Sequence, residues 1–217
     1  MKIVTTSDGS HTIYVPELDE HYHSIHGAVQ ESEHIFIRNG FDFCRKDPIH
    51  IFEAGFGTGL NAFLTAMRSS KEKREVCYTA IEKFPLKKEI ISTLNYPNFA
   101  GEEASGIFEL IHSAEWDKPV RISESFNLRK IKGDLEVTPL DGLYDLIYFD
   151  AFGPDKQPEM WTRDIFKIIS ELTRKEGIFV TYSAKGEVKR NLRAAGFSVE
   201  LLPGPAGKRH IIRAIKI

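Results

Sequence analysis

The sequence predicts an α/β fold built around a doubly wound, largely parallel sheet. Short apolar runs alternate with amphipathic segments from residue 49 onward, a glycine-rich turn follows the first run, and acidic residues end several of the runs. In such a sheet, ligands bind beyond the carboxyl ends of the strands, near the point where the strand order reverses. The acids at these ends are therefore candidate site residues.

The alternation gives an expected order of elements. We expect strand 49–54, helix 59–69, strand 75–82, helix 85–94, extended pieces at 107–112, 120–122 and 127–131, strand 143–150, helix 163–173, strand 177–183, helix 187–195, and two final strands at 198–202 and 210–217. Pro85 suits a first helical position, where its missing N–H costs no hydrogen bond. The strand at 143–150, L-Y-D-L-I-Y-F-D, is the strongest buried strand of the chain.

The residues before this alternation are expected to form an appendage. Residues 2–6 and 11–15 alternate around S-D-G-S, which is typical of a β-hairpin. A helix is expected at 28–38, ended by Asn39 and Gly40. The expected division is an appendage at residues 1–45 and one domain at residues 46–217.

Composition points to a soluble globular protein. The 217 residues are 41% hydrophobic and 28% charged. No run approaches the roughly 20 apolar residues that span a bilayer, and the N-terminus lacks an apolar signal segment. Cys44 and Cys77 do not form a C-x-x-C pair and are expected to be reduced. These features predict a cytoplasmic protein, and we expect no metal site.

The glycine-rich turn lies in residues 49–61, I-H-I-F-E-A-G-F-G-T-G-L-N. Gly55, Gly57 and Gly59 allow a sharp turn and a close approach of backbone to ligand. The spacing differs from the G-x-G-x-x-G of dinucleotide sites. Glu53 would repel a pyrophosphate but attract the ammonium group of a nucleoside that carries an amino acid. The turn resembles the first motif of S-adenosylmethionine (SAM)-dependent methyltransferases.

Further acids follow the later strands. Glu82, followed by Lys83, is placed to bridge two ribose hydroxyls, and Asp134 could accept a hydrogen bond from an adenine amino group. Asp150 ends the most apolar strand and is the candidate catalytic residue. Each acid alone also fits a helix cap or a turn. Their repetition at consecutive strand ends favours a ligand site.

Two aromatic residues and a basic C-terminal region are candidates for substrate binding. Phe152 and Trp161 could form a slot for a flat base, or could pack in the core. The net charge is −2, but the chain beyond residue 184 is locally basic. Its cations are Lys185, Lys189, Arg190, Arg193, Lys208, Arg209, Arg213 and Lys216, against Glu187 and Glu200. This distribution fits a phosphate backbone, and fits an ordinary solvated surface about equally well.

Several of these motifs resemble the methyltransferase half of the MnmC family of tRNA-modifying proteins. The matching segments are F-E-A-G-F-G-T-G-L-N-A-F-L (52–64), E-K-F-P-L (82–86), F-D-A-F-G-P-D-K-Q-P-E-M-W-T (149–162), K-R-N-L-R-A-A-G-F (189–197) and G-K-R-H (207–210), with a lead-in S-I-H-G-A-V-Q-E-S-E-H-I-F (24–36). The resemblance implies a class I SAM-dependent methyltransferase fold. It also implies methylation of the amine of 5-aminomethyl-(2-thio)uridine at the wobble position of tRNA.

The chain departs from the family pattern in two respects. Bifunctional members carry an FAD-dependent oxidoreductase domain for which this chain has no length, so we expect no FAD-dependent activity and envisage a separate oxidoreductase acting upstream. The block after the catalytic strand has Ala151, Gly153, Asp155 and Gln157, and His210 follows the Lys-Arg pair. These differences leave Asp150 unchanged but bear on the choice of tRNA.

The implied reaction is an in-line methyl transfer from a sulfonium to an amine. Because an ordinary carboxyl pKa near 4 makes a poor base for an alkylammonium, we expect Asp150 mainly to orient the amine and stabilise its developing charge. Phe152 or Trp161 would stack on the extruded base. The remaining candidate substrate contacts are Pro154, Lys156, Lys189, Arg190, Lys208 and Arg209, the cations through anticodon-stem phosphates.

Two other functions are compatible with these motifs. An aminopropyltransferase of the spermidine-synthase type would share the fold and use decarboxylated SAM, although Glu53 suits a ligand that keeps its amino-acid group. A catalytically silent nucleotide-binding partner subunit belongs to another class. The row of acids at the strand ends argues against it.

Overall fold

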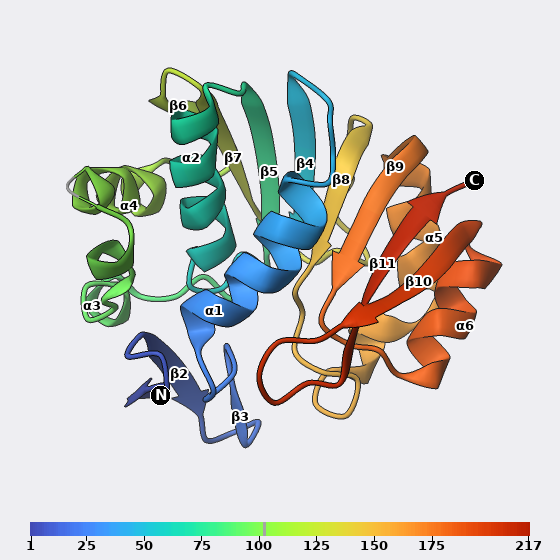
Figure 1. Cartoon of the computed structure of the whole chain (residues 1–217), viewed down its shortest axis with the longest axis horizontal. Coiled ribbons are helices and arrows are strands. Elements are labelled where there is room, and N and C mark those ends of the chain that lie inside the picture. Colours follow the sequence, from blue (N-terminus) through green and yellow to red (C-terminus); the bar gives the residue numbers. More distant parts are fainter. Residues whose placement is uncertain (102) are drawn as a thin grey trace.

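The computed structural model describes residues 1–101 and 103–217, which form an eight-stranded mixed sheet between helices and a small N-terminal sheet (Figure 1). The N-terminal strands are β1 (Lys2–Thr5), β2 (His11–Val15) and β3 (Glu20–His21). The large sheet contains β4 (Ile49–Ala54), β5 (Val76–Glu82), β6 (Pro119–Ser123), β7 (Phe126–Lys132), β8 (Tyr144–Phe149), β9 (Thr173–Thr181), β10 (Phe197–Pro203) and β11 (His210–Lys216). The predicted α/β fold is confirmed.

The helices alternate with these strands. They are α1 (Ala28–Ser32), the π-helix η1 (Glu33–Phe41), α2 (Leu60–Glu72), α3 (Lys88–Ile91), the 3-10 helix η2 (Tyr96–Phe99), α4 (Ala104–Ser113), the 3-10 helix η3 (Pro158–Trp161), α5 (Arg163–Leu172) and α6 (Gly186–Ala194). Within the described part of the chain, none of them combines the length and the apolar character that crossing a bilayer requires.

The strand order places a switch point beside β4. The order in the large sheet is β10-β11-β9-β8-β4-β5-β7-β6. Strand β4 pairs in parallel with both β5 and β8, while β11 runs antiparallel between β9 and β10. The chain thus proceeds from β4 toward one edge and then returns to continue from β8 toward the other. A crevice for a ligand is expected at this reversal.

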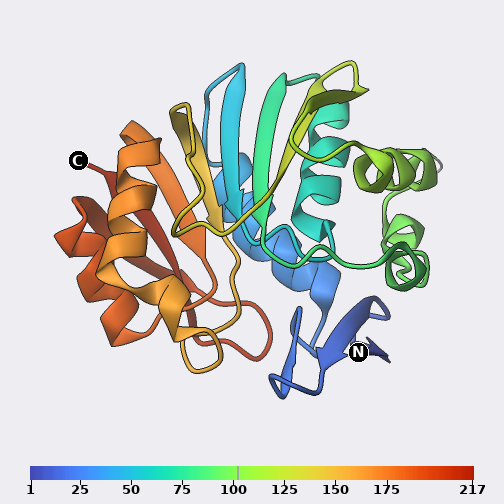
Figure 2. The same ribbon diagram turned by 180° about the vertical axis from the view of Figure 1, so that it is seen from behind.

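Helices cover both faces of the sheet. The helix pair α1 and η1 lies with α2 on one face, and α5 and α6 cover the other, as the two opposite views show (Figure 2). Each interface holds a cluster of buried apolar side chains. The small N-terminal sheet lies beyond the end of the large sheet to which β4 and β8 point, and therefore beside the expected crevice.

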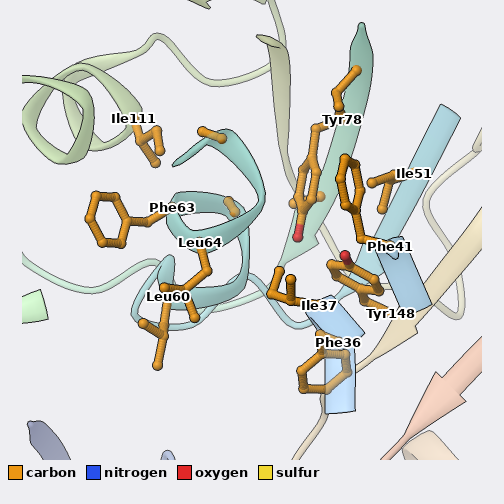
Figure 3. Packing of buried hydrophobic residues seen from close by; sticks show 14 of the residues in the cluster. Phe36, Ile37, Phe41, Ile51, Leu60, Phe63, Leu64, Tyr78, Ile111 and Tyr148 are labelled. Atoms are coloured by element: carbon orange, nitrogen blue, oxygen red, sulfur yellow. The ribbon is translucent and has the colours of Figure 1, made fainter. Parts of the chain in front are cut away.

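The N-terminal helix continues past its predicted end. The stop at Asn39 and Gly40 is wrong, since η1 runs through both residues to Phe41. A side chain at Gly40 would meet Tyr148 at 3.1 Å, so this glycine serves close packing on the sheet. Figure 3 shows Phe36 and Phe41 beside Tyr148, with ring centroids of Phe36 and Tyr148 5.1 Å apart. The helical part of the N-terminal segment thus packs into the main core.

Residues 107–112 are helical, so the first of the three predicted extended pieces is wrong. They belong to α4, in which Ala104, Phe108 and Ile111 are buried at spacings typical of one helix face. Phe108 packs edge-on against Phe63 of α2, with ring centroids 5.5 Å apart. The other two pieces are the strands β6 and β7. The helix predicted at 85–94 is reduced to the single turn α3 and is followed by η2.

Candidate active site

A cavity of about 550 Å³ lies beyond the carboxyl ends of β4, β5 and β8. It is lined by the loop between β4 and α2, the ends of β5 and β7, and the turn that follows β8. Residues 20–25 of the N-terminal segment and Lys208 of the β10–β11 loop form its outer wall. This volume suits a small organic ligand, and the site sits at the switch point of the sheet.

The glycine loop brings backbone close to its neighbours. Gly55 has φ +91°, and a Cβ there would lie 2.8 Å from the backbone oxygen of Asp150. Gly57 has φ +50° and donates its N–H to Oε2 of Glu82 at 2.9 Å. A Cβ on Gly57 would lie 3.1 Å from the ring of Tyr22. The loop is thus held between two strand ends and the N-terminal segment.

Glu82, Lys83 and Asp134 lie together along one side of the cavity. Oε1 of Glu82 accepts the N–H of Phe84 at 2.8 Å, which fixes the carboxylate at the end of β5. Lys83 forms a 2.7 Å ion pair with Asp134, and its hydrogen bond lowers the pKa of Asp134. The structure therefore brings together three of the residues predicted to bind a nucleoside.

Glu53 occupies a different place from the one its sequence position predicted. Its side chain is fully buried beneath the cavity and does not line it. Oε1 accepts a hydrogen bond from Nδ2 of Asn61 at 2.9 Å. Burial raises the pKa of Glu53 well above its usual value. Glu53 thus lies one layer below the cavity lining, and its attraction of a ligand ammonium stays a prediction.

Asp150 faces the cavity at the end of β8. Its Oδ2 accepts a second hydrogen bond from Nδ2 of Asn61 at 2.8 Å. Burial raises the pKa of Asp150 to about 7, against a weaker lowering effect of the Asn61 hydrogen bond. The expectation of an ordinary carboxyl pKa is therefore wrong. A carboxyl that titrates near neutrality is suited to accept a proton during the reaction.

The raised pKa gives a prediction for stability. Because the folded state holds a proton on Asp150 up to about pH 7 while the unfolded state releases it near the ordinary pKa of 3.8, stability falls across that interval. Asp150→Asn should remove this loss and raise the free energy of unfolding by on the order of 2 kcal/mol at pH 8. Urea denaturation should show a difference that is small at pH 4, grows with pH and levels off above pH 7. An equal difference at pH 4 and pH 8 would contradict the assignment.

Phe152 and Trp161 have different environments. Phe152 lines the cavity and meets Tyr22 edge-on, with ring centroids 5.0 Å apart. Trp161 is 3% exposed, donates its Nε1–H to the backbone oxygen of Phe152 at 2.8 Å, and does not line the cavity. The base-stacking role offered for Trp161 is thus corrected to a supporting one, because its ring packs against Phe149 in the core. Pro154 also lies outside the lining.

The candidate phosphate contacts divide into two groups. Lys208 turns inward, pairs with Glu31 and lies over the ring of Tyr182, with Nζ 5.1 Å from the ring centroid. Its predicted contact with phosphate stays a prediction. Lys156 faces Asp19 at 3.6 Å. Lys189, Arg190 and Arg209 lie outside the cavity lining.

Sequence reasoning missed several residues of the site. Asn61 follows the last glycine by two positions and could have been found as a polar residue in the first turn of the helix after the motif. His23 lies beside the glycine loop, with Nε2 2.7 Å from Oγ1 of Thr58. Burial lowers the pKa of His23 to about 4. The hydroxyl of Tyr182 donates to the backbone oxygen of Ala151 at 2.8 Å. No local pattern marks these last two, because they arrive from distant segments.

Comparison with known proteins agrees with this geometry. A family described as S-adenosyl-L-methionine-dependent methyltransferase matches residues 111–217. The bifunctional protein MnmC of tRNA 5-methylaminomethyl-2-thiouridine biosynthesis from Campylobacter hominis is 34% identical over 172 residues, which cover 78% of this chain and 26% of that protein. The MnmC protein of Cupriavidus metallidurans is 32% identical over 222 residues, which cover 95% of this chain and 32% of that protein.

The crystal structure of MNMC2 from Aquifex aeolicus superposes with a TM-score of 0.81 at 27% sequence identity, covering 99% of this chain and 70% of that one. This chain is a SAM-dependent methyltransferase of the MnmC type. The fold of this MnmC-type methyltransferase is the class I fold that its motifs predicted, and SAM is its cofactor.

The similarity to the MnmC relatives covers only part of their length. The MnmC-type chain spans about a quarter to a third of the length of these two curated relatives. A spermidine synthase from Thermotoga maritima has a TM-score of 0.61 at 14% identity, covering 100% of this chain and 72% of that one. This second likeness shows a shared fold.

Among the described residues of the MnmC-type chain, no three His, Cys, Asp or Glu side chains are grouped to hold a metal ion.

Proposed function

We propose that this protein transfers a methyl group from SAM to the amine of a 5-aminomethyluridine, with or without 2-thiolation, at the wobble position of tRNA. One observation carries the choice of an amine: the cavity contains a carboxyl, Asp150, whose pKa is raised to about 7. The names of the MnmC relatives, which refer to methylaminomethyl-2-thiouridine biosynthesis, support the choice of nucleoside.

The residues on one side of the cavity fit SAM. Gly55 and Gly57 line the cavity and would face the amino-acid end of SAM, and a Cβ at either position would push the loop against Asp150 or Tyr22. Glu82 would hold the ribose hydroxyls, and Asp134, paired with Lys83, would lie at the adenine. When bound, SAM supplies an electrophilic methyl group on a sulfonium. Gly59 acts indirectly, by starting α2 in a left-handed conformation at φ +72°.

The other side of the cavity fits a base that carries an amine. Asp150 would accept a proton from the substrate ammonium and hold the resulting amine in line with the methyl group. Phe152 offers a ring for stacking on an extruded uridine. Tyr22 supports this ring edge-on, and Trp161 fixes the backbone of Phe152 from below. The role of Asp150 thus extends from orientation to proton transfer.

Nucleoside mass analysis tests this function. Undermodified tRNA is incubated with the protein and with SAM that carries a deuterated methyl group, and is then digested to nucleosides. We expect 5-aminomethyluridine to gain one labelled methyl group. Label on another nucleoside would contradict the proposed substrate. An aminopropyl adduct formed from decarboxylated SAM, in place of methylation, would assign the fold to the alternative reaction.

Two exposed cations of the C-terminal region suggest how tRNA binds. Arg190 on α6 and Arg209 on the β10–β11 loop are exposed, and within the part of the chain that the structure describes neither forms an ion pair. Charge reversal of both, Arg190→Glu with Arg209→Glu, should weaken tRNA binding at least tenfold at about 0.1 M salt and reduce the salt slope by about two. Filter binding across a salt series measures both quantities.

A matched charge reversal serves as the control. Lys175 is exposed on β9, near the amino end of that strand and away from the cavity. Lys175→Glu should leave both the affinity for tRNA and the salt slope close to those of the unchanged protein. An equal loss of affinity in this variant would show that overall charge, rather than the surface around Arg190 and Arg209, governs binding.

The proposed reaction has consequences for location and for an upstream step. Because the substrate is tRNA, we place the protein in the cytoplasm. A 5-aminomethyl group has to be supplied by an earlier reaction, and we propose a separate FAD-dependent oxidoreductase as the source. The division into an appendage at 1–45 and a domain at 46–217 is kept as a proposal, with the helical part of the appendage packed in the core.

A further inference from the structure

We propose that Asn61 is a positioning residue, which holds the Asp150 carboxylate in place through one side-chain amide hydrogen bond and anchors itself on Glu53 through the other. The inference rests on the proposed function only for what Asp150 does to the substrate. The geometry that carries it is independent of the substrate, since it concerns three side chains of β4, α2 and the end of β8.

The amide of Asn61 joins two carboxyl groups. Its Nδ2 lies 2.9 Å from Oε1 of Glu53 and 2.8 Å from Oδ2 of Asp150. An amide nitrogen has two N–H donors, so this pair of bonds uses both. Asn61 is 2% exposed and Glu53 is fully buried, and water therefore does not compete for these donors.

The orientation of the amide is determined by its two partners. Oδ1 of Asn61 is buried and has no hydrogen-bond partner among the described residues, which carries a desolvation cost. Turning the amide over would place this oxygen against two carboxyl oxygens and lose both bonds. The helix adds rigidity, because Oγ1 of Thr65 donates to the backbone oxygen of Asn61 at 2.7 Å. The amide therefore has one favourable orientation.

The two ends of the bridge differ in burial. Glu53 is fully buried and does not line the cavity, whereas Asp150 lines it, so Glu53 anchors the amide from the core and Asp150 presents its carboxyl to the ligand space. Within the described chain, Oδ2 of Asp150 is the oxygen that accepts a side-chain hydrogen bond. Oδ1 is thereby left for the substrate amine.

Other charged groups that face Asp150 remain unchanged when Asn61 is replaced. Glu31 of α1 raises the pKa of Asp150 and Lys208 of the β10–β11 loop lowers it, while Asp150 in turn raises the pKa of Tyr182. The hydrogen bond from Asn61 is the larger of the effects that lower the pKa of Asp150. Its removal should therefore shift the titration of Asp150 to higher pH.

The test compares Asn61→Ala with the unchanged protein in two measurements. Carbon-13 NMR of the aspartate carboxyls, with the Asp150 signal assigned by its loss in Asp150→Asn, should show Asp150 titrating at higher pH in Asn61→Ala. Single-turnover methyl transfer should slow by roughly 10- to 100-fold, as expected for a misplaced catalytic group. The dissociation constant for SAM should change by less than about threefold, as expected when the interaction lost acts on the reacting group rather than on the cofactor.

Two variants separate positioning from loss of structure. Asn191 on α6 is also buried, and its Nδ2 donates to the backbone oxygen of Trp161 at 2.9 Å. Asn191→Ala removes a comparable buried amide and should leave the Asp150 titration unchanged. Glu53→Gln keeps a side-chain oxygen that can accept from Asn61, and Asp150 in this variant should titrate almost as it does in the unchanged protein.

The outcomes are distinct. An unchanged Asp150 titration in folded Asn61→Ala would overturn the proposal, as would an equal shift in Asn191→Ala. The NMR result does not depend on which molecule is methylated. If the titration shifts as expected while the unchanged protein fails to methylate 5-aminomethyluridine, the proposed function fails and the positioning role of Asn61 stands.

Discussion

Asp150→Asn should reduce methyl transfer by at least about a thousandfold while the dissociation constant for SAM changes less than about threefold. The variant keeps the size of the side chain and an oxygen that can accept from Asn61, but it cannot take a proton from the substrate ammonium. Rapid-quench single-turnover kinetics with labelled SAM measures the first quantity. Calorimetric titration of SAM measures the second.

Asp155→Asn is the matched control for this prediction. Asp155 lies in the same loop, and its side chain is 77% exposed and paired with Lys185. Its amide variant should retain at least about half of the normal rate, because the lost ion pair is at the surface. Turnover by Asp150→Asn within tenfold of normal would remove Asp150 from the chemical step.

Gly55→Ala should abolish SAM binding and methyl transfer together. A Cβ at this position would lie 2.8 Å from the backbone oxygen of Asp150, and the backbone has φ +91°. Relief of the clash would push the glycine loop away from the end of β8. We expect the dissociation constant for SAM to rise at least about a hundredfold, as for other losses of close positioning.

Gly142→Ala separates the clash from backbone strain. Gly142 also has φ +91°, but a Cβ there would meet Tyr144 at 3.6 Å, an ordinary contact. Both variants should lose about 1 kcal/mol or more of stability, the cost of placing alanine at positive φ. Only Gly55→Ala should lose SAM binding. Normal SAM affinity in folded Gly55→Ala would contradict the assignment of this loop to the cofactor.

The sequence was sufficient for most strands of the large sheet and for the location of the site. Strand β4 begins and ends where the apolar run predicted, and the acids Glu82 and Asp150 lie at the cavity. Both results follow from local rules, because a buried parallel strand is apolar on both faces and a parallel sheet aligns its carboxyl ends. A residue at the carboxyl end of such a strand is therefore expected at the site.

How deeply each candidate side chain is buried, and which side chain it pairs with, were not predictable from these local rules. Glu53 shares the strand-end pattern of the other acids, yet the pleat of β4 turns its side chain into the core toward Asn61. Trp161 stands near Phe152 in sequence, but η3 directs its ring inward. The inward turn of Lys208 depends on Glu31, which lies 177 residues away in the sequence. Each outcome depends on contacts between distant segments.

Two predictions of secondary structure were wrong because the local sequence was ambiguous and tertiary packing decided the outcome. The run I-F-E-L-I-H at 107–112 has both β-forming residues and helical spacing, and burial of Phe108 against α2 selects the helix. Asn39 and Gly40 form a common stop signal, but the close approach of η1 to β8 requires a glycine within the helix. Packing therefore outweighed turn propensity.

The central claim is that a half-buried carboxyl with a pKa near neutrality takes the proton of the substrate ammonium. It is tested most directly by the pH dependence of single-turnover methyl transfer, with tRNA and SAM saturating. We expect the rate to rise tenfold per pH unit up to about pH 7, where Asp150 titrates, and to be level above it. A rate that keeps rising through pH 9, in step with the free amine alone, would contradict the claim.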